Sequence, residues 1–292
     1  MTTSQGRRAL LILNRHARNG ATASAELIAA LRQGGLEVQV ADDDALSVGE
    51  RIQRQAAGCD LIIVGGGDGT LNAATPALMV AGLPVGILPL GTANDLAKTL
   101  GIPADPLLAV QLIVNGSTRP MDVGMVNDKP FLNVASIGFS AELADGLSAQ
   151  AKKTWGRFGY ALAAFRLLRR MRRFTLFIEH DGQLEKVKTV QASVGNGRHY
   201  GGGMTVEQSA SADDGQLDFY SLEVRHWWEL LALFPRLRSG THGSTRKVRA
   251  FQTTGIRLST RRPMPINTDG ELTTQTPAVF RIEPDALQVY RP

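Results

Sequence analysis

The stretch that most constrains the fold of this chain is residues 61–72, Leu-Ile-Ile-Val-Gly-Gly-Gly-Asp-Gly-Thr-Leu-Asn. Its first four residues are apolar β-formers, which predict a buried strand. The glycines that follow let the backbone turn sharply and approach a ligand closely. Residues 70–79 then have the pattern of a helix. A strand, a glycine loop and a helix N-terminus together favour anion binding, because free N–H groups and the helix dipole point at one spot.

Asp68 is the unusual residue of this loop. A carboxylate inside a phosphate-binding loop is repulsive unless it binds a metal, a hydroxyl or a ribose, so it indicates chemistry on a nucleotide. The loop is not a Walker A sequence, since no Lys-Ser/Thr follows the glycines, and it is not a full G-x-G-x-x-G, since Thr70 takes the last glycine position. The alternative interpretation is a tight strand-to-helix turn that binds nothing.

Strand and helix patterns alternate over residues 1–122, which predicts a doubly wound parallel sheet. The expected strands are 8–13, 36–41, 61–64 and 85–88, and the expected helices end near 32, 57, 79, 100 and 114. Ligands bind at the carboxyl ends of the strands in such sheets. The loops at 14–20, 65–70 and 90–95 are therefore expected to meet in one cleft.

The pattern changes near Asp122, where short strand candidates punctuated by turn dipeptides begin. These candidates are 121–127, 130–136, 174–179, 183–194, 217–222, 256–259 and 278–282. Two helices are expected among them, at 153–172 and 227–237. The chain is thus divided into an α/β domain, 1–122, and a mostly antiparallel β domain, 123–283. The sequence leaves open whether residues 284–292 return to the first domain.

Composition indicates a soluble globular protein, with 43% hydrophobic and 20% charged residues among 292. The single cysteine, Cys59, excludes an internal disulfide and fits a reducing compartment, and we interpret it as a buried small residue rather than a nucleophile. No run approaches the ~20 apolar residues that span a bilayer. We therefore expect a cytoplasmic protein, or one peripheral to the inner face of the membrane.

Basic residues are concentrated in the segment 152–173, which has eight Lys or Arg and no acid, whereas the rest of the chain has 24 basic and 27 acidic residues. This predicts a surface for an anionic partner. Nucleic acid is not the expected partner, because no aromatic-basic platform or helix-turn-helix pattern is present. Two interpretations remain: a helix packed on the β domain with a solvated face, or a helix that docks on anionic lipid headgroups.

A second loop with residues suited to binding and catalysis is Leu88-Pro89-Leu90-Gly91-Thr92-Ala93-Asn94-Asp95. Gly91 permits a close approach, Thr92 offers a hydroxyl to phosphate, and Asp95 adds a carboxylate. Taken alone, Asn94-Asp95 is typical of a helix N-cap. With Asp68 expected beside it, a two-acid site for a magnesium nucleotide is the better interpretation, because phosphoryl transfer depends mainly on positioning and charge neutralisation.

Three motifs in this order resemble the diacylglycerol kinase catalytic family, and its bacterial YegS-type lipid kinases in particular. They are Gly66-Gly67-Asp68-Gly69-Thr70, Leu90-Gly91-Thr92-Ala93-Asn94-Asp95 and Asp269-Gly270-Glu271. The first alone is shared with NAD kinases and phosphofructokinases. The resemblance implies a Rossmann-like α/β domain, an antiparallel β-sandwich and an active site in the cleft between them. It also implies Mg²⁺-dependent transfer of the γ-phosphate of ATP to a lipid hydroxyl.

The resemblance also assigns roles to individual residues. Glu271 would be the base that takes the proton of the lipid hydroxyl, and Asp68, Asp95 and Asp122 would form an acidic network around the metal and substrate. The ATP contacts would be Asn14, Gly66, Gly67, Asp68, Gly69, Thr70, Leu71, Asn72 and Thr92. Without the resemblance, Asp-Gly-Glu would be interpreted as a hairpin tip and Asp122 as the polar start of a strand.

A structural metal site is implied at Ser211, Asp214 and Gln216, where a carboxylate and two backbone carbonyls suit Mg²⁺ or Ca²⁺. The residues themselves favour a plain Asp-Gly hairpin turn. One departure lies after the first strand, where Asn14-Arg15-His16-Ala17-Arg18 stands in place of the usual Asn-Pro-x-(Ser/Ala)-Gly. The alternatives to a lipid kinase are an NAD kinase and a lipid- or nucleotide-binding regulator without catalysis.

Overall fold

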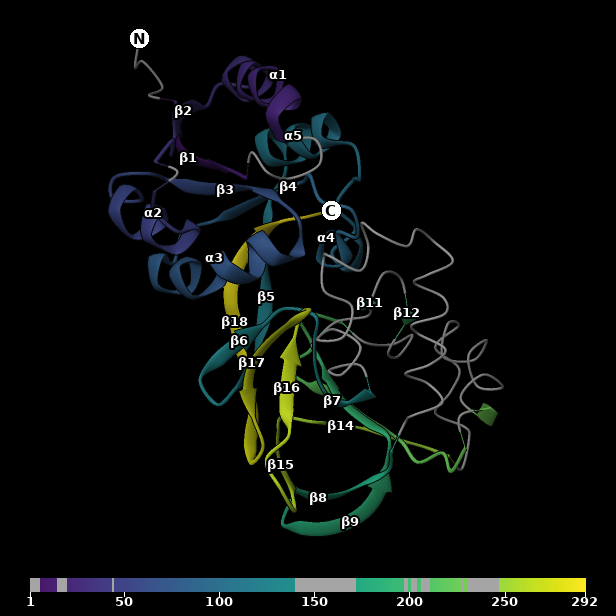
Figure 1. Cartoon of the computed structure of the whole chain (residues 1–292). Coiled ribbons are helices and arrows are strands. Elements are labelled where there is room, and N and C mark those ends of the chain that lie inside the picture. Colours follow the sequence, from purple (N-terminus) through teal and green to yellow (C-terminus); the bar gives the residue numbers. More distant parts are fainter. Residues whose placement is uncertain are drawn as a thin grey trace. The chain divides into compact units, whose positions relative to one another are not determined.

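The computed structural model describes residues 6–14, 20–43, 45–139, 172–196, 199–200, 204–205, 211–226, 228–229 and 247–292. The chain forms two compact units (Figure 1). Unit 1 consists of Met1–Val123 and Pro284–Pro292, and unit 2 of Gly124–Glu283. Two strands, β5 (Thr118–Val126) and β18 (Ala278–Tyr290), contribute residues to both units.

Unit 1 is built around a parallel sheet in the order β2-β1-β3-β4. The end of β18 adds to β4 in parallel, with Val289 opposite Val85. The strands are β1 (Arg8–Leu13), β2 (Glu37–Val40), β3 (Leu61–Gly66) and β4 (Val85–Pro89). The helices are α1 (Gly20–Gln33), α2 (Val48–Gln55), α3 (Asp68–Ala81), α4 (Asp95–Thr99) and α5 (Pro106–Asn115).

Helices cover both faces of this sheet, with α1 and α5 on one face and α2 and α3 on the other (Figure 1). This explains why β3 is continuously apolar, since every one of its residues is buried. The doubly wound α/β prediction is therefore confirmed. Cys59 lies just before β3 and is buried, which raises the pKa of its thiol and agrees with a packing role.

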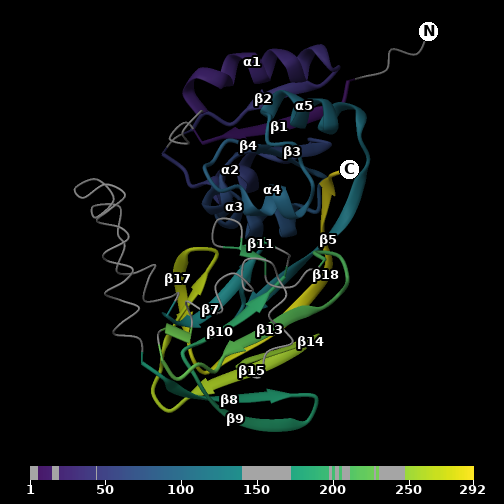
Figure 2. The same ribbon diagram turned by 90° about the vertical axis from the view of Figure 1, so that its right-hand side faces the viewer.

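Unit 2 contains two large antiparallel sheets, both visible in Figure 2, and a two-stranded antiparallel sheet formed by β11 and β12. One large sheet has the order β14-β13-β10-β7-β16-β17, and the other joins the start of β18 to β15, β8 and β9. The strands of the first are β14 (Val248–Thr253), β13 (Leu217–Leu222), β10 (Gln191–Gly195), β7 (Val134–Gly138), β16 (Pro265–Thr268) and β17 (Glu271–Gln275). The others are β15 (Gly255–Thr260), β8 (Phe174–His180), β9 (Gln183–Thr189), β6 (Lys129–Phe131), β11 (His199–Tyr200) and β12 (Met204–Thr205).

The core of unit 2 is a continuous apolar cluster supplied by both sheets. Alternate residues of each strand point into it, for example Leu176 and Ile178 from β8 and Val194 from β10. Phe131 and Phe280 meet edge to face, with ring centroids 6.4 Å apart. The expected antiparallel β-sandwich is confirmed.

Two of the expected strands are each divided. The run 130–136 breaks at Leu132 and Asn133, because their N–H groups donate to the Asp269 carboxylate instead of to a neighbouring strand. The run 183–194 breaks at Val190, where the chain leaves β9 and enters β10 in the other sheet.

The strands β11, β12, β14, β16 and β17 were not among the expected elements. Most of the helices expected at 153–172 and 227–237 lies outside the described residues. Within the described part of the chain, no helix has the length and apolarity that a membrane crossing requires.

Candidate active site

Asn14, which follows β1, and the loops after β3 and β4 lie together at the carboxyl ends of these strands. The Asn14 backbone N–H donates to the Gly65 carbonyl at 2.9 Å, and the Asn14 side chain donates to Thr70 Oγ1 at 2.9 Å. The Leu90 N–H donates to the Gly66 carbonyl, also at 2.9 Å. Three segments far apart in the sequence therefore form one edge of unit 1, as the parallel-sheet argument predicts.

Glycine is required where two of these loops touch. A Cβ on Gly91 would lie 2.5 Å from the Cα of Gly67 and 2.7 Å from Asn94 Oδ1. A Cβ on Gly66 would lie 2.5 Å from Thr70 Oγ1. No side chain larger than hydrogen fits at these places without displacing backbone or a packed neighbour, so the two loops interlock through their glycines.

The N-terminus of α3 lies in this edge. Its N-cap is Gly67, which has no side chain to bond the first-turn N–H groups. The helix has 14 residues, so its dipole is well developed. This terminus can therefore receive an anion.

Asp68 joins the two loops. Its Oδ1 accepts a hydrogen bond from the Leu96 N–H at 3.1 Å, so it caps α4 from a distant part of the chain. Asp95 is 6% exposed and lies 3.3 Å from the Lys98 ammonium. Asn94 is the N-cap residue of α4, but its backbone is left-handed, and its side chain bonds back to Gly91 at 3.0 and 3.1 Å instead of capping the helix.

The other expected ATP contacts differ in exposure. Gly69 and Thr92 are exposed, and Asn72 is half-buried. Leu71 is only 4% exposed, so its side chain belongs to the core and only its backbone is available to a ligand. Asp122 is 2% exposed on β5, where its Oδ1 accepts the Asp285 N–H at 2.9 Å.

Glu271 lies in unit 2, as the exposed first residue of β17. The preceding turn is made by Asp269 (φ 50°) and Gly270 (φ 103°). The Asp269 carboxylate accepts the N–H groups of Leu132, Asn133 and Val134 at 2.6 to 3.0 Å. These bonds fix the β16–β17 turn against the start of β7, and they hold Glu271 in place.

The loop with the expected structural metal ligands is a tight turn. Ser211 and Gln216 are half-buried and Asp214 is exposed. Gly215 has φ 68°, and the Gln216 N–H donates to Asp214 Oδ1 at 3.0 Å. A tight turn and oxygen donors are therefore both present.

Both halves of the chain match known protein families. Residues 8–126 match the diacylglycerol kinase catalytic domain, and residues 133–291 match the YegS C-terminal NAD kinase beta sandwich-like domain. A Mycobacterium tuberculosis protein named "Diacylglycerol kinase" is 31% identical over 91% of this chain and 88% of its own length. A Pseudomonas putida protein named "Probable lipid kinase YegS-like" is 32% identical over 99% of this chain and 96% of its own.

This chain belongs to the diacylglycerol kinase family.

A solved structure from Bacillus anthracis, described as a candidate diacylglycerol kinase, agrees with this conclusion. It has a TM-score of 0.84 and 26% identity, and the match covers 99% of this chain and 96% of that chain. Membership of a kinase family makes the chain a phosphotransferase.

The polar side chains of the site offer oxygen donors, which are the ligands that hard divalent cations prefer. In the described part of the chain, no group of three or more His, Cys, Asp or Glu side chains is arranged to hold a metal. A cation here would therefore be completed by backbone carbonyls, water or phosphate oxygens. Such a mixed oxygen set is the one that Mg²⁺ usually has beside nucleotides.

Two residues that fix the turn before Glu271 were given no role by the sequence. Asp269 entered only through a turn dipeptide and the Asp269-Gly270-Glu271 motif, and Asn267 was not singled out, although its Oδ1 accepts the Gly270 N–H at 2.9 Å. The Asp-Gly dipeptide predicts a turn, but it does not show which backbone the carboxylate binds. The backbone partners of Asp269 lie more than 130 positions away in the sequence. No local pattern reveals such a pairing.

Proposed function

We propose that this chain is an ATP- and Mg²⁺-dependent lipid kinase that transfers the γ-phosphate of ATP to a hydroxyl of a membrane lipid such as diacylglycerol or phosphatidylglycerol. The observation that carries the proposal is the interlocked pair of glycine loops, with Asp68 and Asp95 beside the N-terminus of α3. The names of the relatives support a lipid as the acceptor.

The nucleotide would bind at the edge of unit 1. Backbone N–H groups of Gly66, Gly67 and Gly69, together with the dipole of α3, would bind its phosphates. Asn14 and Thr70 are already joined by a hydrogen bond, so their polar atoms are fixed before a ligand arrives. The exposed Thr92 hydroxyl is free of packing constraints and would make a further contact.

Asp68 and Asp95, with Asp122 extending the acidic network, would contribute oxygen donors to a Mg²⁺ site completed by water, backbone carbonyls or phosphate oxygens. When bound, the ion supplies positive charge that offsets the negative charge on the transferred phosphoryl group. Ser211, Asp214 and Gln216 would hold a second, structural Mg²⁺ or Ca²⁺ through one carboxylate and two backbone carbonyls.

Glu271 would accept the proton of the lipid hydroxyl through its carboxylate. The hydroxyl oxygen then forms a bond to the γ-phosphorus while the bond from that phosphorus to the β–γ bridging oxygen breaks, and ADP leaves with the electron pair. Asp269 and Asn267 act as positioning residues, since their hydrogen bonds fix the turn that carries Glu271.

The deciding experiment measures transfer of labelled phosphate from ATP with Mg²⁺ to lipids in mixed micelles, with NAD as a parallel acceptor. Label in a lipid supports the proposal and names the substrate. Label in NAD alone would overturn it in favour of an NAD kinase, whose sandwich domain the C-terminal half resembles. ATP binding with no label in any acceptor would favour a non-catalytic regulator.

The base assignment is tested by Glu271→Gln. We expect turnover to fall by about 10²- to 10⁴-fold, because a neutral amide cannot accept the proton. The dissociation constant for ATP should not change. Glu179→Gln is the matched control, since Glu179 is an exposed carboxylate of unit 2 paired with Arg257, and it should retain full turnover. Unchanged turnover of Glu271→Gln would show that another group is the base.

A further inference from the structure

The outer face of the sheet formed by β9, β8, β15 and the start of β18 is exposed and carries an unbalanced charge at one end. Leu176, Ile178, Val187 and Leu258 point into the core. The alternate residues therefore point outward. Two rows of register neighbours cross this outer face, Lys188–Thr175 and Lys186–Phe177–Ser259, and neither contains an acid.

Further cations lie beside these rows. Arg173 precedes β8, and its guanidinium donates to the Lys188 carbonyl at 2.9 Å, which fixes the two residues side by side. Thr260 is opposite Leu176, so the next residue, Arg261, lies at the same end of the sheet. We define the cationic end as Arg172, Arg173, Lys186, Lys188, Arg261 and Arg262. All six are exposed, and none forms an ion pair with a described residue.

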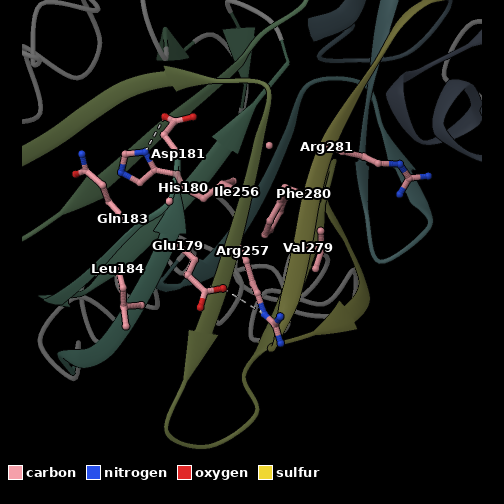
Figure 3. A pocket seen from close by; sticks show the side chains of 12 residues that line it. Glu179, His180, Asp181, Gln183, Leu184, Ile256, Arg257, Val279, Phe280 and Arg281 are labelled. Atoms are coloured by element: carbon pink, nitrogen blue, oxygen red, sulfur yellow. Dashed lines mark hydrogen bonds and ion pairs between the residues drawn. The ribbon is translucent and has the colours of Figure 1, made fainter.

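The opposite end of the same strands carries arginines that are paired with carboxylates. It borders a cavity of about 630 Å³ at the β8–β9 turn, shown in Figure 3. There Arg257 reaches toward Glu179 at 3.8 Å, and Arg281 pairs with Glu283 at 2.9 Å and Asp128 at 3.1 Å. Because these arginines already have carboxylate partners, the cavity is a poor site for an anion. The positive potential of the face is therefore concentrated at the cationic end.

We propose that the cationic end docks this face on an anionic phospholipid bilayer. Charge complementarity favours this occupant: six exposed cations without an ion-pair partner among the described residues match a surface of many negative headgroups better than they match one small anion. Phe177, half-buried opposite Lys186, can enter the headgroup region, whereas the exposed Leu184 and Val279 lie at the other end of the face, beside the cavity.

The inference rests on the proposed function, because a kinase that acts on a membrane lipid must reach the bilayer. It extends the expectation for the basic segment 152–173. Only the last two residues of that segment, Arg172 and Arg173, are described, and they lead directly into β8. β9 and the residues that follow β15 thus add four cations to those that the sequence alone placed in that segment.

The test measures co-sedimentation of the full-length protein with phosphatidylcholine vesicles, with and without phosphatidylglycerol. The patch variant is Lys186→Glu with Lys188→Glu. The matched control is Arg119→Glu with Lys129→Glu, which changes net charge equally at exposed positions elsewhere. Each cation near an anionic bilayer strengthens binding roughly fivefold. The patch variant should therefore bind anionic vesicles at least about 25-fold more weakly than the control, and added salt should weaken binding of the wild type.

Equal vesicle binding by the patch variant and the wild type would overturn the proposal, as would an equal loss in the control. Loss of self-association in the patch variant would instead make the face an interface with a second copy. Thermal unfolding should show that both variants fold. Phosphate transfer to a dispersed short-chain lipid should be unchanged in the patch variant. If the wild type transfers no phosphate yet binds vesicles through these lysines, the docking inference stands and the proposed function fails.

Discussion

At the scale of single residues, the glycines of the two loops differ in whether a side chain would fit at their positions. Gly91 and Gly69 belong to adjacent motifs but face different surroundings. A Cβ on Gly91 would collide with the backbone of Gly67, whereas a Cβ on Gly69 would meet no atom within 4 Å. Gly69 also lies in the first turn of α3. The same substitution should therefore have opposite effects at the two positions.

We predict that Gly91→Ala lowers the free energy of unfolding by about 1–3 kcal/mol, because the two loops must separate. It should also weaken ATP binding. Gly69→Ala should raise the free energy of unfolding by roughly 0.5–1 kcal/mol, because alanine is the better helix former. Urea unfolding of both variants measures the difference. Similar effects of the two variants would show that the loops do not interlock as described.

At the scale of elements, helix ends are determined by short-range chemistry. α2 begins with a reciprocal capping box: Ser47 Oγ accepts the Glu50 N–H, and the Glu50 carboxylate accepts the Ser47 N–H at 2.8 Å. The side-chain and backbone hydrogen bonds from Ser47 lower the pKa of Glu50, and the positive charge of Arg54 acts in the same direction. The ionised form of Glu50 is therefore favoured over the protonated form more strongly in the folded chain than in the unfolded one.

This linkage gives a prediction for the pH dependence of stability. Because the pKa of Glu50 is lower in the folded chain, its carboxylate stabilises the fold. This contribution is complete at pH values above the unfolded-state pKa of about 4.3, and it is lost as the pH falls through the folded-state pKa. Ser47→Ala removes the main cause of the shift. The variant should be less stable than the wild type at neutral pH, and the gap should narrow below about pH 4. Thermal unfolding across this range measures the gap, and a gap that stayed constant in acid would contradict the assignment.

At the scale of the whole molecule, the two ends of the chain belong to one unit. Leu287, Val289 and Tyr290 of β18 are buried, and Val289 pairs with Val85. The Tyr290 hydroxyl accepts a hydrogen bond from Arg7 at 2.8 Å. The C-terminal nine residues therefore complete the sheet that the first 123 residues begin.

We predict that a fragment of residues 1–123 is much less stable than the same fragment with residues 284–292 joined by a flexible linker. Burying three large apolar side chains stabilises by about 1.5–3 kcal/mol each, a sum comparable with the whole stability of a domain. Circular dichroism with urea unfolding compares the two. A matched linker with a scrambled 284–292 sequence is the control. Equal stability of all three fragments would show that β18 is not needed in unit 1.

The sequence by itself determined the features that depend on local chemistry. Apolar runs and glycine positions defined β1, β3 and β4, and the alternation of strands and helices predicted the doubly wound sheet. Turn dipeptides and short strands predicted the sandwich. These signals are contained within a few residues, because strand burial, helix periodicity and turn geometry act over that distance.

Only the tertiary structure decided which distant groups meet. Asp68 caps α4 at Leu96, Asp269 binds the backbone at the start of β7, and Asn94 closes its loop rather than capping a helix. Lys186, Lys188 and Arg261 gather at one end of a sheet only through strand register. A side chain has many possible partners in sequence, and the packing of the whole chain selects one, so no local pattern could have named them.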